Sequence, residues 1–103
     1  MGNKVGNAIT TVLELEAYLK SGNAKEALLG DGLHVRRASR RFVVRYRVRG
    51  DMKVREYTIP AAYGKCDNQT SWAKAKARAS AIVLNAKVGT DLIAEEERAL
   101  ADA

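Results

Sequence analysis

An alternation of apolar and basic residues near the middle of the chain constrains the fold more than any other feature. Within 42–49 the even positions are apolar, and Arg45, Arg47 and Arg49 occupy odd ones. Successive side chains of a β-strand point to opposite faces of the sheet. This segment therefore predicts a strand with one face in a core and a row of guanidinium groups outside. Residues 33–59 hold nine Lys or Arg against two acids, which favours a polyanion, and first of all nucleic acid, as the ligand.

Flanking patterns predict the remaining elements. Apolar residues at helical spacing predict a helix over 8–20, ended by Ser21-Gly22-Asn23, before a turn at 24–29 and a loop at 30–32. Three strands are predicted over 33–37, 41–49 and 54–59, and Pro60 is expected to end the third. After a polar loop at 61–70, Thr70 or Ser71 can cap a long helix that runs to about Val88.

These elements predict an α+β fold in the order α-β-β-β-α. An N-terminal helix precedes a three-stranded antiparallel sheet, and the long C-terminal helix packs on one sheet face through Trp72 and Ile82. Gly89 is expected at the C-terminal cap of that helix. Residues 91–103 form an acidic, helical tail, which Asp91 can cap. The opposite sheet face is left to solvent or to a ligand.

The third predicted strand disturbs the basic pattern. If Tyr57 and Ile59 face the core, Arg55 faces it too, and Glu56 joins the arginines on the outer face. A bulge could reverse this facing, or Glu56 could accept a hydrogen bond from a cytosine amine.

Little in the chain suggests catalysis. His34 is the only histidine and Cys66 the only cysteine, so a disulfide within the chain and a metal site of clustered His and Cys are both excluded. The string from His34 to Arg37 matches an H-x-x-R pattern of recombinase catalytic domains, but it falls in a predicted strand. No base stands beside Cys66, and no phosphate-binding glycine loop is present. We expect no enzymatic activity and no cofactor, and we expect a soluble, intracellular protein, since no apolar run could span a bilayer.

Several segments, in order, resemble a known family. They are Gly32–Arg36, Arg45–Arg47 with Gly50, Arg55–Tyr63, Ala73–Ala79, and Gly89–Asp91 with Glu95. Together they resemble the N-terminal arm-type DNA-binding domain of phage and genomic-island integrases, which are tyrosine recombinases. This chain departs from the family's pattern at 64–70, an insertion before the long helix, and before Leu29.

The resemblance implies a sheet laid into the major groove of double-stranded DNA at arm-type sites. It also implies a bacterial cytoplasmic protein, found with the nucleoid. Residues 1–90 would be the arm-type domain, and 91–103 would lead toward core-binding and catalytic domains of the same protein. By matched position, DNA contact is carried onto Arg36, Arg45, Arg47 and Arg49, with Arg40 and Lys53 on adjoining connections.

Two other functions fit the sequence. A double-stranded RNA-binding module also has the order α-β-β-β-α and would use Lys74 and Lys76 at the start of its last helix. A protein-interaction domain could present the same basic sheet to an acidic partner. Replacing the sheet arginines or the helix lysines separates the first two hypotheses.

Overall fold

A computed structural model describes residues 9–30 and 32–102 of the chain. The α+β class is confirmed. The described residues form three helices and five strands, in the order α1 (Val12–Ser21), β1 (Glu26–Gly30), β2 (Leu33–Arg36), β3 (Arg41–Tyr46), β4 (Arg55–Tyr63), β5 (Gln69–Thr70), α2 (Trp72–Lys87) and α3 (Leu92–Asp102). Residues 1–8, Asp31 of the expected loop and Ala103 of the expected tail lie outside the described residues.

The sheet has five strands in the order β1-β2-β3-β4-β5, so the expectation of three strands is wrong. Neighbours from β1 to β4 run antiparallel, and β5 pairs with β4 in parallel. Residues 26–30 form an edge strand where a turn was expected. Ala27 is opposite Val35 of β2 and packs with Leu29 against the core, so tertiary pairing stabilises a segment with a weak local pattern.

Strand β4 continues through Pro60, which was expected to end it. Val43 is opposite Thr58, whereas Arg41 is opposite Ala62, so Pro60 falls in an irregularity of the β3–β4 ladder. A proline has no N–H to donate and is tolerated where a bulge interrupts the ladder.

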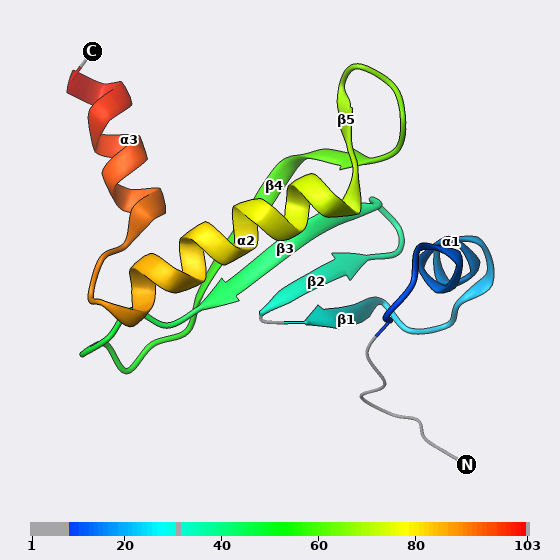
Figure 1. Cartoon of the computed structure of the whole chain (residues 1–103), viewed down its shortest axis with the longest axis horizontal. Coiled ribbons are helices and arrows are strands. Elements are labelled where there is room, and N and C mark those ends of the chain that lie inside the picture. Colours follow the sequence, from blue (N-terminus) through cyan, green and yellow to red (C-terminus); the bar gives the residue numbers. More distant parts are fainter. Residues whose placement is uncertain (1–8, 31, 103) are drawn as a thin grey trace.

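Helices α1 and α2 pack on the same face of the sheet. One core cluster joins Leu15 and Leu19 of α1 to the apolar stripe of α2 and to the inward residues of β2, β3 and β4. The fully buried members include Phe42, Leu33 and Ile82. In Figure 1, α2 lies across the sheet and α3 turns away from it at the end opposite α1. Among residues 9–30 and 32–102, no helix lies over the other sheet face.

The boundaries of the helices show which local sequence signals were sufficient to predict where a helix begins or ends. Ser71 caps α2 by accepting a hydrogen bond from the backbone N–H of Lys74, and Gly89 follows the helix with a φ of +93°. These two expectations are confirmed. Helix α1 begins four residues later than expected, because Thr11 and Glu14 form a capping box. The spacing Thr-x-x-Glu carries that signal in the sequence.

Candidate nucleic-acid interface

The sheet face opposite the helices, called the open face below, is built by side chains from four strands. The register places Glu26 beside Arg36, His34 beside Val43, and Arg45 beside Glu56. The facing expected for the third strand is confirmed: Tyr57 packs against the core, Arg55 shares its side of the sheet, and Glu56 is on the open face.

Four charged side chains on the open face form a closed ring of ion pairs. Arg36 contacts Glu26 at 3.2 Å and Glu56 at 2.9 Å. Arg45 contacts the same two carboxylates at 2.7 and 3.1 Å. We call Glu26, Arg36, Arg45 and Glu56 the charge ring. Each of β1 to β4 supplies one member, and the ring has no net charge.

Hydrogen bonding within the ring stabilises the ionised form of its most enclosed carboxylate. The hydrogen bond from Arg45 is the main cause that lowers the pKa of Glu26 from 4.5 to about 2. The same contacts raise the pKa of both arginines. His34 lies beside the ring, and burial, followed by the charge of Arg45, lowers its pKa. At neutral pH, therefore, His34 adds no positive charge to the open face.

The ring should make stability depend on pH. Because the pKa of Glu26 is lower in the folded state, its ionised form stabilises the fold above about pH 4.5, and this contribution is lost as the pH falls toward 2. The side chain is 29% exposed, so we discount the shift for solvent screening. Glu26→Gln should lower the free energy of unfolding by about 1–2 kcal/mol at pH 7 and by almost nothing near pH 2.

Urea denaturation at pH 7, 4 and 2 measures this difference. Glu97→Gln, on an exposed position of α3, removes the same charge and is the control. An equal loss of stability from Glu26→Gln at all three pH values would contradict an ionic contribution.

Beyond one end of the ring, residues 47–54 form a loop between β3 and β4, which we call the cationic loop. Strand β3 ends at Tyr46, so Arg47 and Arg49 belong to this loop and not to the strand row expected with Arg45. Arg47, Arg49 and Lys53 are exposed, and none forms an ion pair with another described residue. These three charges are therefore available to a ligand.

Hydrogen bonds brace the base of the cationic loop. The backbone N–H of Arg49 donates to the carbonyl of Ala86 at the end of α2, at 2.8 Å. The carboxylate of Asp51 accepts from the backbone N–H of Lys53 at 3.0 Å and pairs with Arg55 at 2.6 Å. The loop is thus attached to both the sheet and α2, and its cations are held on a defined backbone.

Asp91 connects this loop to α3. Its side chain accepts hydrogen bonds from the Tyr46 hydroxyl at 3.0 Å and the Ala94 backbone N–H at 3.1 Å, and it pairs with Arg55 at 3.1 Å. The expected cap at Asp91 is confirmed. Burial, with the hydrogen bond to Asp91, raises the pKa of Tyr46 to about 12, so the hydroxyl stays protonated and donates at neutral pH.

A second group of cations lies at the opposite end of β3. Arg40 and Arg41 are exposed and Arg37 is half-buried in the β2–β3 connection. Arg40 has a φ of +59°, rare for a residue other than glycine, and its backbone bonds Arg36 on one side and Tyr63 on the other. With six residues in β3, the two cationic ends lie roughly 20 Å apart.

The six residues expected to contact DNA therefore divide into three places. Arg36 and Arg45 are in the charge ring, Arg47, Arg49 and Lys53 are in the cationic loop, and Arg40 is at the far end. The sequence reasoning missed Glu26 as a partner of the arginines, because the segment around it was expected to be a turn. Residues 26–30 do not alternate polar and apolar side chains, so the sequence carries no period of two that would place Glu26 on this face.

The lysines of α2 lie on the helix side of the sheet. Lys74 and Lys76 are exposed there, while Arg78 pairs with Glu96 at 2.7 Å and stacks 5.3 Å from the centre of the Tyr57 ring. The lysines of α2 and the cations of the open face do not form one continuous surface, because the sheet lies between them. Arg78 is engaged in contacts within the protein, with Glu96 and Tyr57.

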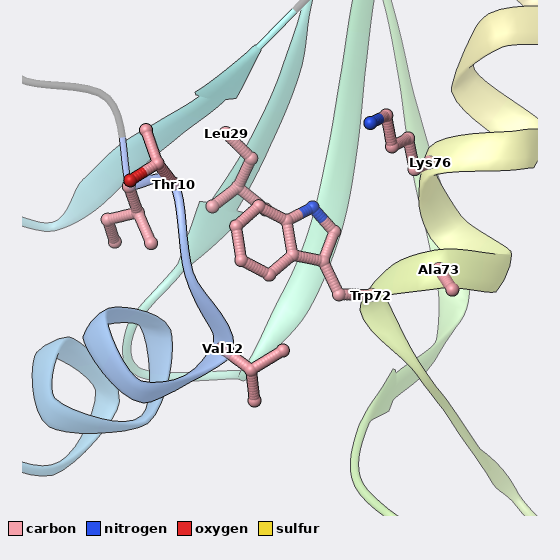
Figure 2. A pocket seen from close by; sticks show the side chains of 7 residues that line it. Thr10, Val12, Leu29, Trp72, Ala73 and Lys76 are labelled. Carbon is pink, nitrogen blue, oxygen red and sulfur yellow. The ribbon is translucent and has the colours of Figure 1, made fainter.

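Between α1 and α2 the helix side is hollowed around Trp72. Figure 2 shows the indole of Trp72 in this hollow, between Val12 and Leu29, with Lys76 at its rim. The volume is about 450 Å³. Trp72 packs against the core cluster and is half-buried, which agrees with the packing role expected for it.

The described residues contain neither a candidate metal site nor a membrane-spanning helix. Among residues 9–30 and 32–102, no group of three His, Cys, Asp or Glu side chains could hold a metal ion. In the same part of the chain, no helix has the length and apolar character needed to cross a membrane. No protein-family model, no curated protein and no solved structure matches this chain.

Proposed function

We propose that this chain binds double-stranded DNA through the open face of its sheet and has no catalytic role of its own. One observation carries the proposal: the neutral charge ring lies between two groups of cations, Arg47, Arg49 and Lys53 at one end of β3 and Arg37, Arg40 and Arg41 at the other, and none of these six forms an ion pair with another described residue. Charge arranged in this way suits two rows of phosphates with a less charged floor between them. A DNA groove has this arrangement, because its base edges lie between the phosphates of the two strands.

The dimensions support duplex DNA as the ligand. The two cationic ends are roughly 20 Å apart, enough to reach the phosphates on both sides of a major groove about 12 Å wide. Strands β2 and β3, which carry Arg36 and Arg45, would then lie over the groove floor. Arginine donates to guanine in a bidentate manner, so this central part can contact base edges.

The sequence resemblance suggests which duplex is bound. Arm-type domains of integrases bind arm sites that flank the recombination core, and we propose the same class of site here. Strand exchange would then depend on core-binding and catalytic domains of the same protein. The partners in this proposal are double-stranded DNA and those domains.

A salt titration with duplex DNA tests the proposal. Six cations at the two ends, Arg37, Arg40, Arg41, Arg47, Arg49 and Lys53, could each neutralise one phosphate. The logarithm of the binding constant should then fall with the logarithm of salt concentration with a slope near −5, at about −0.9 per contact. Fluorescence anisotropy of a labelled 30-base-pair duplex measures it. A slope near zero, or no binding at low salt, would remove the proposal.

Exposed lysines on the helix side favour one alternative. Lys74 and Lys76 stand at the start of α2, where a double-stranded RNA-binding module would use them. A duplex RNA of the same length, titrated in parallel, distinguishes the two ligands. If the ligand is an acidic protein instead, that protein should compete with DNA for the open face.

A further inference from the structure

The charge ring lies on the open face between the two groups of cations, and each of its members comes from a different strand. Both guanidinium groups already contact two carboxylates, and each carboxylate contacts both guanidinium groups. A domain that only had to attract DNA would gain from leaving these arginines unpaired. What Glu26 and Glu56 do there is not explained by affinity.

The ring disfavours phosphate on physical grounds. A phosphate that approached Arg36 or Arg45 would have to displace a carboxylate from the guanidinium, and it would then lie next to that carboxylate. Opposing an unwanted ligand with like charge is a general route to specificity. The low pKa of Glu26 means that this carboxylate stays charged throughout the physiological range.

The ring does not disfavour base edges in the same way. Its side chains are 29–42% exposed, so donors of the arginines and acceptors of the glutamates remain open to a ligand. In the major groove, guanine offers two acceptors and its paired cytosine offers an amine donor. A G·C pair can therefore satisfy both charges of the ring at once, whereas a phosphate satisfies only the arginines.

We propose that Glu26 and Glu56 are specificity determinants: they withhold Arg36 and Arg45 from phosphates and make them available to G·C base edges. This inference rests on the proposed function, since it concerns how the same face selects its duplex. It assigns the binding of phosphates to the two ends and the selection of sequence to the ring.

The test removes the two carboxylates and keeps their shape. Glu26→Gln with Glu56→Gln should free two arginines for phosphate, so the salt slope on a 30-base-pair duplex of random sequence should steepen by up to about 1.8. That change is about 12-fold more loss of affinity between 50 and 200 mM salt than in the wild-type protein. Preference for a G·C-only over an A·T-only duplex of equal length should fall.

A matched control separates the ring from net charge. Glu95→Gln with Glu97→Gln adds the same charge on exposed positions of α3, away from the sheet. Its slope should stay close to the wild-type slope. Thermal unfolding checks that the ring variant is folded, and Glu56→Gln alone, at the more exposed carboxylate, is the milder second variant.

The outcomes distinguish this inference from the proposed function. Wild-type protein that binds duplex DNA, with equal slopes for the ring and control variants, overturns the specificity role alone. Absence of duplex binding by the wild-type protein and by the ring variant overturns both proposals. A steeper slope for the ring variant only, with a weaker G·C preference, supports the role of the two glutamates.

Discussion

Replacing Arg47, Arg49 and Lys53 together with Ala should weaken binding to duplex DNA about 100-fold at 150 mM salt. All three side chains are exposed, and none is paired with a described residue, so the substitution should remove three phosphate contacts and little stability. From the salt dependence, each contact is worth about fivefold at this ionic strength. Anisotropy titrations at several salt concentrations should also show a slope that is shallower by about 2.7.

A double variant on the helix side of the sheet is the matched control. Lys74 and Lys76 are exposed near the start of α2, and replacing them with Ala removes the same charge as Arg47→Ala with Arg49→Ala does in the loop. It should reduce duplex DNA binding far less than the loop variant does. If the helix-side variant has the larger effect, and more so on duplex RNA, the open face is not the interface and the RNA-binding alternative is favoured.

Asp91→Ala should lower the free energy of unfolding by about 2–4 kcal/mol. The side chain caps α3, accepts from the Tyr46 hydroxyl and pairs with Arg55, so three contacts end at once. Tyr46 is only 7% exposed, and its hydroxyl would lose its described acceptor within the protein. Urea denaturation monitored by circular dichroism measures the change.

Two further variants separate the contributions of these three contacts to the free energy of unfolding. Asp91→Asn keeps an oxygen for the cap and for Tyr46 but loses the charge that faces Arg55, so it should cost less than Ala. Tyr46→Phe removes only the hydroxyl contact and should cost about 1 kcal/mol. A loss from Asp91→Ala that is no larger than the loss from Tyr46→Phe would show that the cap and the ion pair contribute nothing.

Elements with a strong local signal were predictable. The period of two from Phe42 to Tyr46 predicted that Phe42, Val44 and Tyr46 face the core, because a strand must alternate its faces. It did not predict that Val43, between them, is fully buried as well. Ser71 and Asp91 were predicted as helix caps because their side chains satisfy backbone N–H groups that the helix leaves free. Such features depend on neighbours along the chain.

Elements that depend on partners distant in the sequence were not predictable. Strand β1 has a weak pattern of its own and forms against β2, and β4 passes Pro60 because the ladder is irregular there. Arg45 finds Glu26, nineteen positions away, in the segment expected to be a turn. Whether an arginine is ion-paired or free depends on its distance from the nearest carboxylate in the fold. The pattern of charges along the sequence does not give that distance.

The sequence by itself determined that this chain has a basic middle, an α+β fold and a strand with one apolar and one charged face. Only the tertiary structure decided how the basic residues are divided. It pairs Arg36 and Arg45 with two glutamates and leaves Arg47, Arg49 and Lys53 exposed. The physical reason is that composition sets the total charge, whereas the register of four strands decides which charges neutralise one another.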